Sequence, residues 1–310
     1  LEGAGPVDAS AKLAAAARAW VATLDPVNGG FGTAPKQPEP ELIRFLLTRP
    51  DAASRDAAIN AARALVKGAL RDPVDGGFHR RCIDEEWKEP YRQKTLLDQA
   101  RIALALFDAA DAAKDESLRQ AGIGALDFAL KELRNPDGWF AIALDGTLEE
   151  NVDPAKRPVF VKVGSARVGA VAQLVVALKR SREPRFERLA DELIDQVQPN
   201  KELIPTAADL LGVALAAQVL SGENRDQPIP LARDFYFDVA TGSYQASRAQ
   251  LPSGIALRVP ASGDTPSAEV LALLAGVDEK TAIQIRRGLL SAIEYDDQPP
   301  GDVLLGLSQK

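Results

Sequence analysis

The chain has few of the residues that form covalent or metal-based cross-links. Its 310 residues include one cysteine, Cys82, and one histidine, His79. A single cysteine cannot form an intrachain disulfide, and these two residues cannot supply a zinc site unless carboxylates complete it. We therefore expect no metal and no cofactor. Since 46% of the residues are hydrophobic, a chain of this length can fold on its apolar core alone.

Basic surfaces and long apolar runs are also missing. The formal net charge is −7, whereas a nucleic-acid surface needs a basic stripe. No apolar run reaches the roughly 18 residues that indicate a membrane-spanning helix. We expect no nucleic-acid partner, no membrane contact and a cytoplasmic location, with a periplasmic or secreted location left open. Methionine is absent and residue 1 is Leu, so we expect a piece of a longer protein.

Aromatic residues make up 5% of the chain and alanine is abundant, a balance that favours closely packed helices over sheets. The spacing of apolar residues predicts helices over 9–24, 39–49, 54–71, 91–113, 116–134, 165–181, 184–198, 205–221, 265–275 and 278–294. Short strands are expected over 139–145, 158–163 and 233–237. No long polar linker separates these segments, so residues 1–310 are expected to form one domain.

One heptapeptide occurs twice, as DPVNGGF at 25–31 and DPVDGGF at 72–78, with a degenerate copy, NPDGWF, at 135–140. Weaker copies are expected at 198–204 and 238–244. Proline ends a helix, Asn-Gly or Asp-Gly permits a tight turn, and the aromatic residue packs back onto apolar surface. Repetition at this interval indicates tandem helical hairpins. We expect them to close into an all-α toroid and not to stack as an open rod.

Residues 75–99 concentrate the side chains that could carry chemistry. The unperturbed pKa of histidine lies near neutrality, so His79 is a candidate acid or base, or else a histidine bonded to a loop carbonyl. Glycoside hydrolysis needs two carboxylates, for which Asp84 and Asp98 are candidates, although an acidic run is usually a solvated face. Lys94 and Asp98 are four apart, which by default predicts a surface ion pair. Cys82 is expected to be a packed thiol.

The stretch DGGFHRRCIDEEWKEPYRQKTLLDQA resembles the spermatogenesis-associated protein 20 family and its bacterial relatives, which read GGGFHRYSVDxxWxVPHFEKMLYDQA. GGFGTAPKQPEPELIRFLL upstream and DTPSAEV at 264–270 resemble further family segments. The resemblance implies an (α/α)6-type toroid of helical hairpins with short β-hairpins in the loops, as in six-hairpin glycosidases and sugar 2-epimerases. It also implies a thioredoxin-like domain ahead of the toroid, which we expect to be absent from this chain. Tyr91 and Gln93 stand where the family has histidine and glutamate.

Two functions follow as hypotheses. The first is carbohydrate binding or processing at the mouth of the toroid, by glycoside hydrolase-like or sugar-modifying acid–base chemistry if the chain is an enzyme. Its catalytic residues would be His79, Asp84 and Asp98, and its substrate-binding residues would be Phe31, Phe78, Trp87, Tyr91, Lys94 and Gln99. The second is a catalytically inactive scaffold that partners a thioredoxin-like domain.

Overall fold

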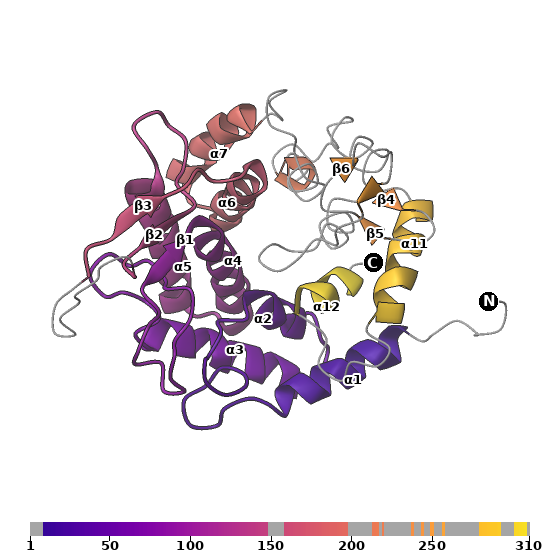
Figure 1. Ribbon diagram of the computed structural model, residues 1–310. Helices are drawn as coiled ribbons and strands as arrows, with labels where there is room; N and C mark the ends of the chain where they lie inside the picture. The colour runs from indigo at the N-terminus through magenta and orange to yellow at the C-terminus, as the bar shows by residue number, and fades with distance from the viewer. Residues whose placement is uncertain are drawn as a thin grey trace.

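The computed structural model describes residues 9–147 and 158–197, with the segments 213–216, 219, 237–238, 243–244, 249–250, 256–257, 279–292 and 301–308. This part of the chain is mainly helical, and the helices are arranged in a ring (Figure 1). The helices are α1 (Ala9–Val21), α2 (Pro40–Leu47), α3 (Ala52–Lys67), α4 (Leu96–Ala113), α5 (Glu116–Phe128), α6 (Val168–Ser181), α7 (Pro184–Gln196), α11 (Glu279–Ala292) and α12 (Gly301–Leu307).

The ring has an inner and an outer layer. Helices α2, α4, α6 and α12 lie on the inside, and α1, α3, α5, α7 and α11 lie around them (Figure 1). Each described inner helix from α2 to α6 continues through a short turn into the next outer helix, so the chain winds as helical hairpins. Helix α4 packs against both α2 and α6, and also against α5 outside it. The toroid expected from the repeated loop is confirmed.

The ring closes where α12 packs against α2. The two backbones meet at Gly301, since a Cβ placed there would lie 2.4 Å from the backbone nitrogen of Leu42. Only a residue without a side chain permits this approach. Helix α12 was not expected from the sequence. The predicted helix over 278–294 is confirmed as α11, whereas 265–275 and most of 205–221 lie outside the described residues.

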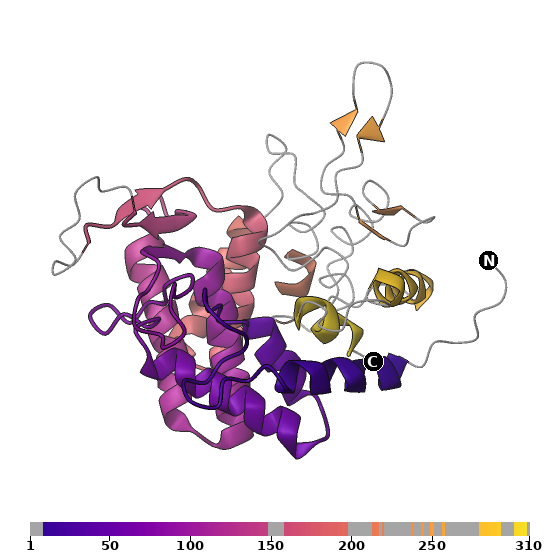
Figure 2. The ribbon, with the colours of Figure 1, turned by 60° about the horizontal axis from the view of Figure 1, so that its bottom comes forward.

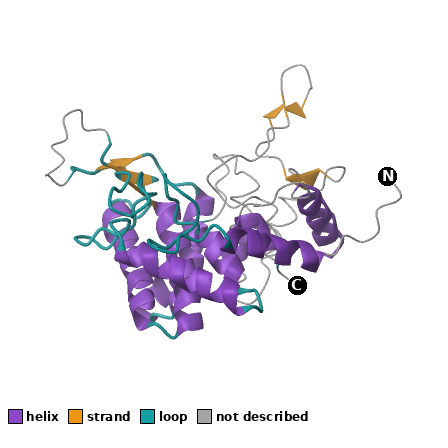
Figure 3. Ribbon diagram, turned by 90° about the horizontal axis from the view of Figure 1, so that it is seen from below, coloured by secondary structure: helices purple, strands orange, loops and turns teal. Residues whose placement is uncertain are grey.

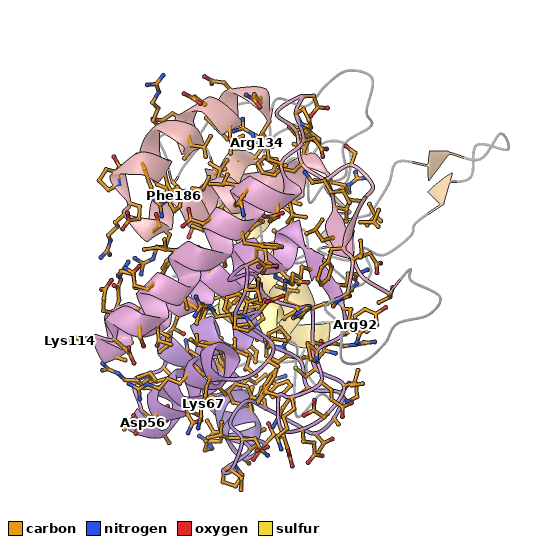
Figure 4. All side chains as sticks on the ribbon, turned by 90° about the vertical axis from the view of Figure 1, so that its left-hand side faces the viewer. Asp56, Lys67, Arg92, Lys114, Arg134 and Phe186 are labelled. Atoms are coloured by element: carbon orange, nitrogen blue, oxygen red, sulfur yellow. The ribbon has the colours of Figure 1, made fainter. Side chains whose placement is uncertain are left out.

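The two faces of the ring differ. Turns on one face are short, at residues 48–51, 114–115 and 182–183, whereas the other carries the long loops that precede α2, α4 and α6 (Figure 3). Figure 4 shows Lys114 on the short-turn face and Arg92 on the long-loop face. Successive helices run in opposite directions, so α2, α4 and α6 all begin at the long-loop face.

A small antiparallel sheet lies on the long-loop face (Figure 2). It contains β1 (Gln93–Thr95), β2 (Ala143–Asp145) and β3 (Val161–Val163) in the order β1-β2-β3. The strands expected over 139–145 and 158–163 are confirmed as β2 and β3. The helix expected to begin at 91 begins at Leu96 instead, because Thr95 caps it by accepting a hydrogen bond from the Asp98 backbone N–H at 3.0 Å. Two-residue strands follow at β4 (Phe237–Asp238), β5 (Ser243–Tyr244), β6 (Ala249–Gln250) and β7 (Ala256–Leu257).

The core fills the space between the two layers. Helix α4 is buried on most of its circumference, and Ile102, Leu106 and Phe107 have no exposed surface. Polar contacts join the inner helices nearer the short-turn face, where Asp108 of α4 accepts hydrogen bonds from Arg44 of α2 at 2.8 Å and Arg180 of α6 at 3.0 Å. The ring is therefore held by an apolar interior and by ion pairs between neighbouring inner helices.

Candidate functional site

The repeated heptapeptide forms the same turn in the two long loops that contain it, before α2 and before α4. Asp25 accepts hydrogen bonds on its carboxylate from the next backbone N–H groups, and Asp72 does the same in the second copy. The backbone N–H of each aspartate donates to the carbonyl of the second glycine, at 2.9 Å in the first loop and 2.8 Å in the second. Gly29 and Gly76 have φ angles of 72° and 78°, which favour glycine. The predicted tight turn is confirmed.

Each of these turns holds a fully buried lysine. Lys36 has no exposed side-chain surface, and its ammonium donates to Asp25 and to the carbonyl of Glu85 at 3.0 Å. It also lies over the Trp87 ring, 5.6 Å from its centroid. A buried ammonium is stable only when it is paired and hydrogen-bonded in this way. The repeated aspartate is thus the partner of a buried cation.

Lys94 is the corresponding lysine of the second loop. Its ammonium donates to Asp72 at 2.7 Å and to both oxygens of Asp75, at 2.9 and 2.7 Å. The rings of Phe128 and Phe160 lie over it, 5.0 and 4.8 Å from the ammonium. The surface ion pair expected with Asp98 is wrong, because residue 94 belongs to strand β1 and points into the core. No surface remains on Lys94 for a substrate.

His79 lies beside this ion cluster. It is 5% exposed, and its Nε2 is 3.9 Å from the Asp72 carboxylate. Burial and the nearby Lys94 ammonium lower the pKa of His79 from 6.5 to about 4, although Asp72 and Asp75 oppose the change. The imidazole is therefore neutral near pH 7, and little of it reaches solvent. These surroundings suit a packed histidine better than a proton donor.

Gln99 joins the second loop to α4. Its side-chain oxygen accepts from the Phe78 backbone N–H at 2.7 Å, and its amide donates to the Phe78 carbonyl at 2.7 Å. Gln99 and Phe78 are both fully buried, and Phe31 of the first loop is 4% exposed. These residues, expected at a substrate surface, instead hold the loops against the helices.

The rest of the 79–91 segment supports the loop in similar ways. Trp87 is 2% exposed and donates from Nε1 to the Gly29 carbonyl at 3.2 Å, so its ring faces are not open to a sugar. The carboxylate of Asp84 accepts from the backbone N–H groups of residues 86, 88 and 89, which lowers its pKa against the effect of burial. Cys82 is fully buried, and burial raises the pKa of its thiol to about 12. Tyr91 is partly buried and stacks on Arg81, whose guanidinium is 4.9 Å from the ring.

Asp98 belongs to a different group, which we call the rim cluster: Glu41, Arg80, Asp98 and Arg101. Glu41 is in the first turn of α2 and Asp98 in the first turn of α4, so both lie at the long-loop face of inner helices. Arg101, one turn further along α4, forms an ion pair with Glu41 that links the two helices. The guanidinium of Arg80 donates to Gln93 at 3.1 Å.

Asp98 is the unusual member of the rim cluster. The residue keeps some exposed surface, but its Oδ2 is buried and has no hydrogen-bond partner among the described residues. Burial raises the pKa of Asp98, and Glu41 adds to the increase, although Thr95, Arg101 and Arg80 oppose it. A carboxyl group of this kind can hold a proton closer to neutral pH than an exposed one.

The structure does not bring the predicted catalytic residues together. Asp84 binds its own loop, His79 lies beside the buried ion cluster of Lys94, and Asp98 lies in the rim cluster. Sequence reasoning missed Glu41 and Arg101, which are 60 positions apart. The available signal was Pro40-Glu41 at a helix start, where acidic residues are favoured. It gave no indication of a partner on another helix.

Comparisons with known proteins concern one segment of the sequence and the fold. No family model matches the chain. A segment of 129 residues is 33% identical to spermatogenesis-associated protein 20 of Homo sapiens and covers 39% of this chain and 16% of the human protein. The protein of the same name from Rattus norvegicus is 29% identical over 147 residues, which cover 44% of this chain and 19% of the rat protein. The matched part is thus under a fifth of each relative.

Solved structures with this fold are similar over nearly the whole chain. Cellobiose 2-epimerase from Bacillus thermoamylovorans gives a TM-score of 0.70 at 13% identity over 97% of both chains. A sugar epimerase from a ruminal bacterium gives 0.68 at 12% identity over 97% of both. At these identities the likeness shows the fold alone. The chain is therefore similar over one segment to spermatogenesis-associated protein 20, as its sequence predicted, and it has the toroidal fold of six-hairpin glycosidase-like epimerases and isomerases.

Proposed function

We propose that the chain binds a carbohydrate at the rim cluster and performs acid–base chemistry on it, with Asp98 as the proton donor. The single observation that carries this proposal is the half-hidden Asp98 carboxyl at the start of an inner helix, with Oδ2 buried and without a partner among the described residues. Proteins with this fold include enzymes that by name act on sugars, which supports the choice of ligand.

The chemistry of Asp98 fits a general acid. Such a group works best when its pKa is raised toward the working pH, because it must hold its proton before transfer. Burial raises the pKa of Asp98, although two arginines lie nearby. A structural alternative exists, since an acid three residues after a threonine N-cap can complete a capping box. That alternative does not account for a buried oxygen without a partner.

Glu41 is the second carboxylate of the proposed site. Glycoside-cleaving mechanisms use a pair of acidic groups in different environments. Glu41 is 8% exposed and forms an ion pair with Arg101, whereas Oδ2 of Asp98 has no hydrogen-bond partner in the described part of the chain. The pair Asp98 and Glu41 replaces the set His79, Asp84 and Asp98 that the sequence indicated.

Titration with sugars tests this proposal. Cellobiose and D-mannose are added to the chain while amide resonances are followed by NMR. We expect saturable shifts in α2 and α4, and at least a tenfold loss of affinity in Asp98→Asn. Asp56→Asn, at an exposed position of outer helix α3 (Figure 4), is the matched control and should bind as the wild type does. Neither sugar binding, or equal binding by Asp98→Asn, would contradict the proposal.

A second candidate function is a non-catalytic scaffold that partners a thioredoxin-like domain. One observation favours it: Phe78, Trp87, Lys94 and Gln99, the best-preserved part of the family resemblance, are buried and hold loops in place. A preserved fold would explain them without any chemistry. The complete gene and its neighbours test this candidate, since absence of a thioredoxin-like domain from both would count against it. A single domain over 1–310 and a cytoplasmic location stay predictions.

No described helix is long and apolar enough to cross a bilayer. The absence of membrane and nucleic-acid partners stays a prediction.

A further inference from the structure

We infer that the two buried lysines are positioning residues of the rim cluster. Lys36 places Glu41 at the start of α2, and Lys94 places Asp98 at the start of α4. The repeated heptapeptide would then fix the position of one carboxylate in each of the two helical hairpins that follow it. This inference rests on the proposed function for its purpose, but its geometry can be tested without any ligand.

The second loop shows the connection most directly. Lys94 is the middle residue of β1, and α4 begins two residues later. The lysine is tied to Asp72 and Asp75 of the loop by three contacts of 2.7 to 2.9 Å. Because no flexible spacer separates β1 from α4, fixing the ammonium also fixes Asp98, four positions further along.

The same loop holds the helix at a second point. Gln99, the neighbour of Asp98, clasps the Phe78 backbone through two hydrogen bonds of 2.7 Å. The Arg80 backbone N–H donates to the Gln93 carbonyl at 2.8 Å, so Arg80 is attached to β1 as well. The carboxyl group of Asp98 and the guanidinium of Arg80 are thus both attached to the segment that the ion cluster around Lys94 holds in place.

The first loop repeats this arrangement. The Lys36 ammonium binds the Asp25 carboxylate, and its backbone exchanges two hydrogen bonds with Cys82, at 2.8 and 3.0 Å. Helix α2 begins at Pro40, and Glu41 follows Lys36 by five positions. The order along the chain is therefore aspartate, buried lysine and helix-start carboxylate in both loops.

The third loop provides a comparison within the same molecule. Asn135 replaces the aspartate, and the described residues of this loop contain no buried lysine. The helix that follows, α6, starts with Val168, Gly169 and Ala170 and has no acid in its first turn. Among the described hairpins, the ion pair and the carboxylate thus occur together or are missing together.

Stability alone does not explain this association. Replacing a buried ion pair with apolar residues is often neutral or stabilising, so such pairs are weak evidence for a stabilising role. A charged group with directed hydrogen bonds does restrict geometry more than an apolar side chain. That restriction is what two carboxylates in one site require.

The experiment uses variants that keep the net charge of each ion cluster unchanged. Lys94→Met is combined with Asp72→Asn, and Lys36→Met with Asp25→Asn, because removing a lysine alone would change that charge and leave a buried carboxylate without a partner. The carboxyl-carbon NMR resonances of Glu41 and Asp98 are measured in each, and they are assigned with Glu41→Gln and Asp98→Asn. Each variant serves as the matched control for the other.

We expect each variant to shift mainly the resonance of its own carboxylate. The Lys94 variant should also move the titration midpoint of Asp98 toward its ordinary value, and the Lys36 variant should leave that midpoint nearly unchanged. Two resonances that stay in place in a folded protein, or that both move equally in both variants, would overturn the inference and leave a structural role only.

A second pair of variants covers failure to fold. Lys36→Arg and Lys94→Arg keep the charge but displace the donor. Each should again shift mainly the resonance of its own carboxylate, by a smaller amount. Sugar binding is measured separately on the wild type. If no sugar binds but each variant still shifts its own carboxylate, the proposed function is wrong and the positioning role stands. If a sugar binds but the shifts are not selective, the positioning role is wrong and the proposed function stands.

Discussion

Acidification should destabilise the chain through His79, and the size of the effect follows from its surroundings. Burial and the Lys94 ammonium lower the pKa of this imidazole from 6.5 to about 4 in the folded state. Between these values the unfolded chain binds a proton that the folded chain does not, so the free energy of unfolding falls as the pH falls. The complete loss is about 3.4 kcal/mol at 1.36 kcal/mol per pH unit, and about 2 kcal/mol of it is reached by pH 5.

The comparison with His79→Gln isolates this contribution. Urea unfolding, followed by the fluorescence of the three tryptophans, of which Trp87 is 2% exposed, gives the free energy of unfolding of both proteins at pH 7.5 and 5. Carboxylates titrate in both and cancel in the difference. We expect the wild type to lose about 2 kcal/mol more than the variant over this range. A difference that stays constant within about 0.5 kcal/mol would refute the reasoning, because it would mean that the folded imidazole charges as freely as the unfolded one.

Further predictions concern the ring closure, the loop clasp and the thiol. In thermal melts, Gly301→Ala should lower the free energy of unfolding by about 1–3 kcal/mol, because its Cβ would meet the Leu42 backbone at 2.4 Å. Gly124→Ala, within α5 beside a flexible arginine end, should be neutral or stabilising in the same assay. Gln99→Ala should cost about 2–4 kcal/mol in urea unfolding, since it leaves a buried N–H and a buried carbonyl without partners; a cost near zero would mean that the loop satisfies them otherwise. Cys82 should resist iodoacetamide at pH 8 in the native state and react in urea, as expected for a fully buried thiol with a pKa near 12; rapid native labelling would contradict its burial.

The helices and the repeated turns could be predicted because their causes are local. The spacing of apolar residues predicted α1 to α7, with bounds that differ from the observed ones by at most six residues. In DPVNGGF and DPVDGGF, the proline, the glycines and the aspartate act within seven positions, so the local sequence is enough to predict the turn. Helix α12 escaped because GDVLLGL is short and contains two glycines, and its burial comes from α2.

The residues of the site were harder to predict because their environments come from distant segments. Asp84, Trp87 and Gln99 have side chains that suit a sugar site. Only the hydrogen bonds of all three, and the burial of Trp87 and Gln99, show that they support the loops. Glu41 drew no attention, because the Arg101 that binds it is 60 positions away. Side-chain type indicates what chemistry a residue can do, whereas access and partners decide whether it does so.

By itself, then, the sequence determined the hairpin repeat and the loops that turn on Gly29 and Gly76, since these depend on neighbours along the chain. The repetition of hairpins predicted a ring, but the contact between α12 and α2 that closes it joins distant segments. The tertiary structure decided which charges meet. It placed Lys94 against Asp72 and Asp75 and not against Asp98, because a strand, and not a helix, carries the lysine into the core. Asp98 was left with a buried oxygen at the start of an inner helix, where the cost of desolvation, a property of the folded ring alone, raises its pKa.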